Sequence, residues 1–439
     1  MIVPAQGAAN VRALAAQALD RILRGDSLRT AFALFSAKLP DARDRALLSS
    51  LLHEGARWWL RYAAALDLLL GHPLRERESQ VYALLVLGLI QIEVLRLPDY
   101  AAVAATVDAA RALRRPRFAG LVNALLRRWL REREALAAQL DADEVTRSAH
   151  PRWLLDTFRA DWPDDVSAII AANNTEAPLW LRVNLRRTTR ADLLRLFNAA
   201  GVAAEVPEQL AQAIVLRQST DITRLPGYAD GAFSVQDGAA QFAAGLLGLS
   251  AGQRVLDACA APGGKSAHIL ESADVHLLAL DSDARRLPRL HENLARLGLH
   301  TQVCAGDAAE PNTWWDGAPF DRILIDAPCS ASGILRRQPD IKLHRRATDV
   351  PTLVATQARL LDTLWPLLGR GGRLVYATCS LLADENTNQI ARFVSRYPDA
   401  RVLPAVPTGW RMPTGPGAQN LPGVMEMDGF FYAVVEKIH

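Results

Sequence analysis

The sequence predicts a multidomain protein with an all-α N-terminal domain, a small α+β module and an α/β domain built on a parallel sheet. Residues 1–140 are rich in Ala, Leu and Arg, and their apolar positions recur with the period of helices. Residues 141–240 mix short apolar runs with one helical stretch. From about residue 250 onward, apolar runs alternate with helical stretches, which is typical of a parallel sheet with helices on both faces.

Each part contains predicted elements in a clear order. The first part has an amphipathic helix over Val11–Leu23 and further helices over about 41–70, 78–95, 100–113 and 117–138. The middle part has strands over 179–184, 213–216 and 232–235, with a helix at about 190–199. In the last part, strands begin near residues 254, 275, 301, 320 and 372, helices lie near 265–272, 284–297, 350–368 and 384–396, and a closing strand covers 429–435. We therefore place the domains at 1–140, 141–240 and 241–439.

Bulk composition excludes several classes of protein. Half of the 439 residues are hydrophobic and 22% are charged, which indicates a well-cored globular chain. The apolar run at 81–90 is only half a membrane span, and the N-terminus lacks the order of a signal peptide, so we expect a cytoplasmic protein. Four cysteines do not make a disulfide framework, and no spacing indicates a metal site.

Positive charge is concentrated in the first part of the chain. The net charge is +3, but residues 1–140 carry 20 Lys+Arg against 13 Asp+Glu. A basic helical domain is compatible with a polyanionic partner. A solvated arginine-rich surface explains the same charge equally well.

The stretch Val255–Ser266 is a strand followed by a Gly-rich turn and a helix start. Glycines let a backbone approach a ligand closely, and the helix start offers unpaired N–H groups. The pattern matches neither a P-loop nor Gly-x-Gly-x-x-Gly. We predict that this turn binds a cofactor through Cys259, Ala260, Ala261, Pro262, Gly263, Gly264 and Lys265.

Acidic residues end three successive predicted strands. Asp257 ends the first, Asp281 ends the second about 20 residues past the turn, and Asp307 ends the third. An acid at the position of Asp281 can bind ribose hydroxyls, and Asp307 is placed to meet an adenine edge. A single Asp of this kind is more often a helix N-cap, but its recurrence favours a cationic adenosyl ligand. Cys259 and Cys304 are expected to pack as small apolar residues.

Two further cysteines follow apolar runs that predict neighbouring buried strands. Cys329 lies in Asp326-Ala327-Pro328-Cys329-Ser330, and Cys379 lies in Thr378-Cys379-Ser380. Chain ends of adjacent parallel strands meet at the edge of the sheet where α/β enzymes build their sites. A buried cysteine is often only a small hydrophobe, but Pro and Ser neighbours at strand ends count against that interpretation.

Two thiols beside a carboxyl group suit methylation of C5 of a pyrimidine. That carbon is a poor nucleophile until a thiolate adds to C6, and a second group must then remove the C5 proton so that the thiolate can leave. A carboxyl group bound at N3 and N4 of cytosine stabilises the developing charge. Cys379, Cys329 and Asp326 supply these groups, and Lys265 is a candidate for favouring the thiolate. Spacing alone does not say which cysteine attacks.

These motifs resemble those of the RNA cytosine-C5 methyltransferases. Residues 257–265 are similar to the S-adenosylmethionine motif of that family, and the motifs around Cys329 and Cys379 are similar to its two cysteine motifs. The resemblance implies a Rossmann-like methyltransferase domain with S-adenosylmethionine as cofactor. It also implies that Cys379 is the nucleophile and that Cys329 assists product release.

The resemblance extends over nearly the whole chain. Leu97-Pro98, Ala102-Val103 and the stretch 121–127 resemble a NusB-like RNA-binding domain, and Leu181–Asn184 resembles the RRM-like module of the family. The stretches 419–423 and 428–433 are similar to the branch that methylates cytosine 967 of bacterial 16S rRNA, which is the implied substrate. Leu343 stands where the family commonly has Trp, and Ser266 stands where it commonly has Thr.

RNA contacts are expected at five polar residues. Arg336, Arg337 and Lys342 follow the Cys329 motif and are placed to grip phosphates, although an exposed basic loop explains them equally well. Arg182 and Asn184 lie on the strand of the RRM-like module. The target base must be unstacked to reach a thiol. We expect a monomer whose partner is 16S rRNA, with no membrane involved.

Two alternatives differ from this interpretation. The first is a non-catalytic RNA-binding assembly or antitermination factor led by the helical domain. The intact cysteine pair with the cofactor acids disfavours it, because a binding module needs neither. The second is a tRNA cytosine-C5 methyltransferase, which the residues themselves leave open.

Overall fold

The computed structural model describes residues 10–74, 76–217, 220–404, 409–411 and 414–438. The chain forms two compact units. The first comprises residues 1–175 together with Leu335–Ala347, and the second comprises Glu176–Ile334 and residues 348–439. A short segment from the middle of the α/β sequence thus belongs to the helical unit. The predicted boundaries near residues 140 and 240 stay a prediction.

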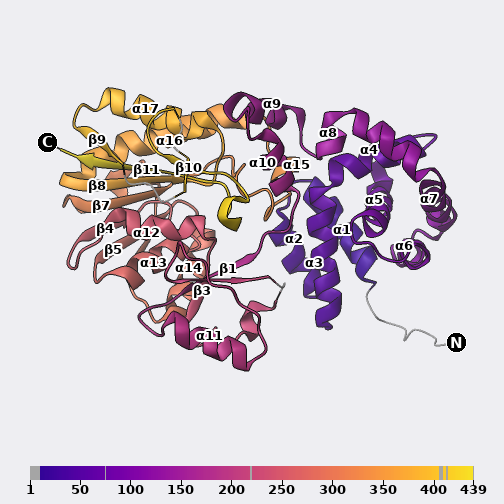
Figure 1. Ribbon diagram of the computed structural model, residues 1–439, viewed down its shortest axis with the longest axis horizontal. Helices are drawn as coiled ribbons and strands as arrows, with labels where there is room; N and C mark the ends of the chain where they lie inside the picture. The colour runs from indigo at the N-terminus through magenta and orange to yellow at the C-terminus, as the bar shows by residue number, and fades with distance from the viewer. Residues whose placement is uncertain (1–9, 75, 218–219, 405–408, 412–413, 439) are drawn as a thin grey trace. The chain divides into compact units, whose positions relative to one another are not determined.

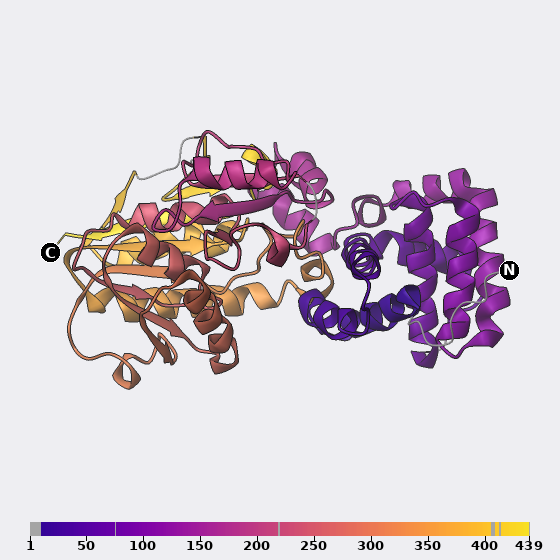
Figure 2. The same cartoon turned by 90° about the horizontal axis from the view of Figure 1, so that it is seen from below.

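Helices packed side by side make up the first unit, as Figures 1 and 2 show. They are α1 (Val11–Leu23), α2 (Leu28–Ser36), α3 (Ala42–Arg57), α4 (Trp59–Leu69), α5 (Ser79–Glu93), α6 (Asp99–Ala112), α7 (Ala119–Ala142), α8 (Glu144–Ser148), α9 (Arg152–Asp161), α10 (Val166–Asn173) and α15 (Ile341–His344). Helix α5 is apolar nearly all round because it packs against α1, α3, α4, α6 and α7. A Cβ at Gly88 of α5 would lie 3.0 Å from Leu126, so a small residue is needed where these helices approach.

In the first unit, helix prediction was accurate for the long periodic stretches and missed several short helices. Helix α1 has the predicted bounds, whereas the predicted stretch 41–70 is two helices that meet at Trp58. Helix α2, capped by Ser27, was not predicted, nor were the helices between 144 and 173. Pro151 directly precedes α9. Among the helices that the structure describes, none has the length and apolar character needed to cross a membrane.

The second unit begins with a three-stranded antiparallel sheet in the order β2-β1-β3. Its strands are β1 (Leu179–Val183), β2 (Ala213–Leu216) and β3 (Phe233–Val235). Helix α11 (Arg190–Ala199) covers one face of the sheet through Leu193 and Phe197 (Figure 1). This is the predicted α+β module, with the predicted helix bounds.

An eight-stranded sheet forms the rest of the second unit, in the order β10-β11-β8-β7-β4-β5-β6 with β9 beside β11. Its strands are β4 (Arg254–Asp257), β5 (His276–Asp281), β6 (Gln302–Ala305), β7 (Phe320–Asp326), β8 (Leu368–Thr378), β9 (Ala400–Leu403), β10 (Ala418–Asn420) and β11 (Phe430–Lys437). Strands β4 to β8 run parallel as predicted. The expectation of a parallel sheet is wrong for β9, β10 and β11, which pair antiparallel at one side.

Helices cover both faces of this sheet (Figure 1). Helices α12 (Phe242–Leu247), α13 (Gly264–Ser272) and α14 (Leu287–Leu297) pack on one face, and α16 (Asp349–Leu364) and α17 (Thr387–Arg396) pack on the other. Each face therefore has its own apolar core. With both faces buried, the ends of the parallel strands are left as the place for a site.

Candidate active site

A cavity of about 330 Å³ lies at the carboxyl ends of the parallel strands. Seven of the predicted site residues line it: Cys259, Ala261, Asp281, Asp307, Asp326, Cys329 and Cys379. The volume lies within the range of small-molecule sites, roughly 300–1,000 Å³. The structure thus brings part of the predicted cofactor set and the three predicted catalytic residues to one place, whereas Ala260, Pro262, Gly263, Gly264 and Lys265 are not among the lining residues.

The turn after β4 is shaped by hydrogen bonds to the neighbouring strand. The Asp281 carboxylate accepts a hydrogen bond from the Ala261 backbone at 2.9 Å, and the Leu280 carbonyl accepts one from the Ala260 backbone at 2.9 Å. Gly263 has φ +97°, and a Cβ there would lie 3.0 Å from the Leu290 side chain, so glycine is needed. The turn then leads into α13, which begins at Gly264.

Two of the three acids that line the cavity, Asp281 and Asp307, each pair with an arginine that the sequence did not single out. Asp281 lies 3.3 Å from Arg286, and Asp307 lies 2.9 Å from Arg359 of α16. Asp307 also caps its own turn by accepting a hydrogen bond from the Ala309 backbone. The cavity therefore offers carboxylates and guanidinium groups together, a mixture that suits a zwitterionic ligand.

Asp257 does not line the cavity, which corrects the prediction of three cofactor acids. Its side chain is buried and accepts a hydrogen bond from the Ser266 hydroxyl at 2.6 Å. Burial raises the pKa of Asp257 to about 7, while the bond from Ser266 acts in the opposite direction. Asp257 is thus an interior residue that ties the end of β4 to α13.

The two cysteines meet because their strands are neighbours. In the parallel pairing of β7 and β8, Asp326 lies opposite Ala377. The Cys329 and Cys379 sulfur atoms are 3.5 Å apart. Cys329 is buried and Cys379 is partly exposed. The hydrogen bond with Cys379, together with burial, raises the pKa of the Cys329 thiol well above its ordinary value.

Lys265 reaches from the start of α13 to the strand end that carries Asp326. Its Nζ donates to Asp326 at 2.6 Å and lies 5.1 Å from the ring centre of Phe430. Burial lowers the pKa of Lys265, but the Asp326 carboxylate outweighs burial and the net shift is upward, with a contribution from Cys379. Lys265 therefore places a positive charge near both Asp326 and Cys379.

A residue that the sequence did not reveal joins the two cysteine loops. Glu385 is buried and accepts hydrogen bonds from Ser330, next to Cys329, and from Ser380, next to Cys379. A lone Glu after a Thr-Cys-Ser motif has no feature that distinguishes it from a surface acid. Only the folded loops show that it lies between them.

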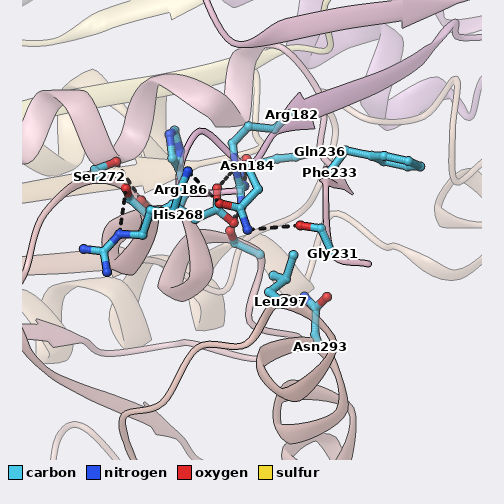
Figure 3. Close-up of polar contacts among 12 residues, drawn as sticks. Arg182, Asn184, Arg186, Gly231, Phe233, Gln236, His268, Ser272, Asn293 and Leu297 are labelled. Carbon is cyan, nitrogen blue, oxygen red and sulfur yellow. Dashed lines mark hydrogen bonds and ion pairs between the residues drawn. The ribbon is translucent and has the colours of Figure 1, made fainter. Parts of the chain in front are cut away.

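Arg182 and Asn184, whose polar contacts are drawn in Figure 3, are both buried and therefore do not fit the predicted RNA contacts. Arg182 pairs with the buried Glu271 at 2.9 Å and donates to the Gly264 carbonyl at 3.0 Å. Asn184 donates to the Gly231 carbonyl at 3.0 Å. Arg182 thus links the α+β module to the helix that starts at the cofactor turn.

Arg336 and Lys342 are also buried, which fits neither the predicted phosphate contacts nor the alternative of an exposed basic loop. Lys342 donates to the Arg57 carbonyl at 2.8 Å and to Asn174 at 3.1 Å, and Arg57 donates to the Arg336 carbonyl at 3.1 Å. Burial, with the nearby Arg57, lowers the pKa of Lys342 well below its ordinary value. These contacts lie within the first unit and hold segment Leu335–Ala347 against its helices. Arg337 is half-buried.

Three residues noted in the sequence pack against apolar cores. Leu343, which stands in place of Trp, packs against the core of the helical unit. Cys304 is partly buried on the edge strand β6 and packs against the core of one face of the large sheet. Cys259 packs against the core beside α16 and lines the cavity as well.

Comparison with known proteins finds three family models along the chain. The model described as 16S rRNA methyltransferase RsmB/F matches residues 244–436. A model for the ferredoxin-like domain of RsmF/B-like methyltransferases matches residues 150–223, and the NusB family model matches residues 9–131.

Whole-chain relatives agree with these models. Ribosomal RNA small subunit methyltransferase B of Pseudomonas putida is 46% identical over 98% of this chain and 99% of its own. The protein of the same name from Vibrio cholerae is 44% identical over 98% of both chains. The solved structure of PH0851 superposes with a TM-score of 0.81 at 20% identity and covers 100% of both chains, which shows a shared fold. The matches confirm the predicted fold class and the predicted resemblance.

We expect Arg182→Met to destabilise the protein by about 3–5 kcal/mol, because it leaves the Glu271 carboxylate buried without its partner. Urea unfolding followed by circular dichroism measures the change. Arg195→Ala is a matched control, since Arg195 is 79% exposed in its pair with Asp192 and its loss should cost under about 1 kcal/mol. An unchanged unfolding midpoint for Arg182→Met would contradict the inference that Arg182 stabilises the link between the α+β module and α13.

We expect Asp257→Asn to change how stability depends on pH. The folded pKa of about 7 lies above the ordinary value of 3.8, so the folded state keeps a proton that the unfolded state has lost. The wild-type free energy of unfolding should therefore fall as pH rises from about 4 to about 7, by roughly 1.4 kcal/mol for each unit of pKa difference. In Asp257→Asn this contribution should be absent.

Urea titrations across that pH range measure the slope. Ser266→Ala provides a second variant, because it removes the hydrogen bond that favours the ionised form and should extend the fall above pH 7. Equal slopes for wild type and Asp257→Asn would show that Asp257 does not titrate in this range.

Proposed function

Because this chain belongs to the 16S rRNA methyltransferase RsmB/F family, we propose that it methylates C5 of a cytosine in 16S rRNA through a covalent adduct with Cys379. The observation that carries the proposal is the pair of thiols 3.5 Å apart that line the strand-end cavity. The resemblance of residues 419–423 and 428–433 makes cytosine 967 the proposed target.

S-adenosylmethionine is the cofactor of this family, and it supplies an electrophilic methyl group carried by a sulfonium centre. The residues of the cavity fit its chemistry. Asp281 and Asp307 would bind hydroxyl and amino groups, Arg286 and Arg359 are charged partners for a carboxylate, and Cys259 and Ala261 of the turn line the cavity.

Cys379 is the proposed nucleophile. Its sulfur adds to C6 of the cytosine, which makes C5 an enamine carbon able to attack a methyl group. Lys265, whose ammonium group donates to Asp326 at 2.6 Å, is the proposed source of positive charge near this sulfur. Asp326, which lines the cavity, is placed to accept a hydrogen bond from the N4 amino group of the base and to stabilise charge that develops on the ring.

Cys329 is the proposed release group. Its interaction with Cys379 sets the proposed order in which the two thiols ionise. While Cys379 is an anion, Cys329 keeps its proton, because the pKa of Cys329 is raised by that neighbour and by burial. Once Cys379 is bonded to C6, the neighbouring charge is gone and Cys329 ionises more readily. The Cys329 thiolate then takes the C5 proton, the C5–C6 double bond re-forms, and Cys379 leaves as thiolate.

The substrate must present its base outside a helix, because Cys379 lies at a cavity and not on an open surface. The basic helical unit is the proposed RNA-binding part, with 16S rRNA as partner. We propose that the protein acts as a monomer in the cytoplasm. The corrected positions of Arg182, Asn184, Arg336 and Lys342 leave the contact residues to be sought elsewhere.

We expect Cys379→Ala to abolish methylation of a 16S rRNA fragment, because no thiolate remains to activate C5. Cys329→Ala should instead accumulate an RNA–protein adduct that survives a denaturing gel, since the C5 proton is not removed. Transfer of labelled methyl groups and gel shift measure the two outcomes. Cys304→Ala is the matched control, because Cys304 lies on β6 and should leave activity unchanged. Full methylation by Cys379→Ala would refute the covalent mechanism.

Deletion of the gene in its host should remove methylation at cytosine 967 of 16S rRNA while tRNA 5-methylcytosines persist. Mapping of 5-methylcytosine across both RNA classes measures this, and re-expression of the wild-type chain should restore the lost site. Loss of a tRNA methylation with 16S rRNA intact would establish the tRNA alternative.

A further inference from the structure

Glu385 is a buried carboxylate that the catalytic steps above do not use. It ends the short 3₁₀ helix Ala383–Glu385, and its side chain is 0% exposed. A carboxylate this deep is costly unless donors surround it. Donors reach Glu385 from three places: the loop after β7, the loop after β8 and helix α16.

Each carboxylate oxygen is shared between elements. Oε1 accepts hydrogen bonds from the Ser330 backbone at 2.8 Å and from Gln357 Nε2 of α16 at 3.1 Å. Oε2 accepts from the Ser330 hydroxyl at 2.6 Å and from the Ser380 hydroxyl at 2.5 Å. Ser330 directly follows Cys329, and Ser380 directly follows Cys379. One side chain therefore touches the residue next to each thiol.

Ser332 closes the same network. Its hydroxyl lies 3.1 Å from the Ser330 hydroxyl and 3.2 Å from the Ser380 hydroxyl, and it accepts from the Leu381 backbone at 2.9 Å. Gln357 also donates to the Pro328 carbonyl at 2.9 Å. The two cysteine loops are thus joined to one another by buried side chains around a single carboxylate, in addition to the pairing of their strands.

We propose that Glu385 is a positioning residue that holds the Cys329 and Cys379 thiols 3.5 Å apart, so that both can reach one base; this role rests on the function proposed above. Both contacts of Oε1 are N–H donors, whereas both contacts of Oε2 are serine hydroxyls, which can donate or accept. An amide in its place removes the charge, and it keeps the Oε1 bonds only if its NH₂ group faces the two hydroxyls, which must then reverse their hydrogen bonds. An error of about 1 Å in the placement of reacting groups can cost about a hundredfold in rate.

The charge of Glu385 also acts on Cys329. The groups that face Cys329 are Cys379, Glu385 and Tyr376, and Tyr376 donates its hydroxyl to the Glu385 carbonyl at 2.7 Å. Arg392 acts on Tyr376 from α17. The Glu385 charge adds to the effects of Cys379 and burial that raise the pKa of Cys329. Removing the charge should therefore make Cys329 ionise at lower pH.

Two measurements on Glu385→Gln test the role. The first is the rate of Cys329 alkylation against pH, without RNA, in a Cys379→Ser background; the midpoint should shift to lower pH when Glu385 is neutral. The second is steady-state methylation of a 16S rRNA fragment, where kcat should fall about 10–100-fold with KM for RNA within about threefold of wild type. Asp384→Asn is the matched control, since Asp384 is the neighbouring acid, is 63% exposed, and should change neither readout.

The possible results distinguish a failure of this inference from a failure of the proposed function on which it rests. A folded Glu385→Gln with wild-type kcat and an unshifted Cys329 midpoint would overturn the positioning role. Activity of Cys379→Ala would overturn the covalent mechanism instead, while the alkylation result would still report on Glu385. If Glu385→Gln does not fold, Ser330→Ala removes one bond to the carboxylate and should lower kcat by a smaller factor; an unchanged kcat there would also count against the role.

Discussion

The parallel pairing of β7 with β8 is the constraint on which the site depends. Backbone bonds continue beyond the strands, from Ala327 to the Ala377 carbonyl and from Gly333 to the Cys379 carbonyl, each at 2.9 Å. Two loops whose cysteines lie 50 positions apart in sequence are thereby kept side by side. The cavity, the Lys265–Asp326 pair and the serine network around Glu385 all lie around this junction.

The α+β module has a structural task within the methyltransferase unit. Its buried Arg182 binds both Glu271 near the end of α13 and Gly264 at the start of that helix. Because the cofactor turn leads directly into α13, these contacts of the module also stabilise the position of the turn. Arg182, a basic residue on a strand of the RRM-like module, thus makes its contacts in the interior of the protein.

Local patterns in the sequence were sufficient to predict which residues meet at the cavity where those residues directly follow a strand. The motifs around Cys329 and Cys379, and the turn at Gly263, each follow a strand directly, so strand order alone predicted that they would meet. Patterns could not show whether a charged side chain has a buried partner far away in sequence, which is why Arg182 and Lys342 were misplaced. Strands β9 and β10 are short, and their antiparallel pairing depends on distant β11.

The same limit explains what was missed at the site. Glu385, Arg286 and Arg359 occur in stretches with ordinary helical or turn composition, and their roles depend on loops that come together only in three dimensions. A prediction from sequence finds residues whose neighbours in the chain are unusual. Residues whose role depends on partners far away in sequence are found only from the three-dimensional structure.

The chain contributes to the helical unit twice, because the segment Leu335–Ala347 belongs to that unit although it lies between two parts of the second unit in sequence. Only Ile334 and Leu335 separate Gly333, which bonds to Cys379, from Arg336, whose carbonyl is held by Arg57 of the helical unit. Asp340 and His344 add bonds to Leu28 and Ile22. The backbone consequently passes from one unit to the other at 175/176, 334/335 and 347/348. Loss of the helical unit during evolution would thus need two coordinated changes, an N-terminal deletion and a redesign of the segment that follows the Cys329 loop.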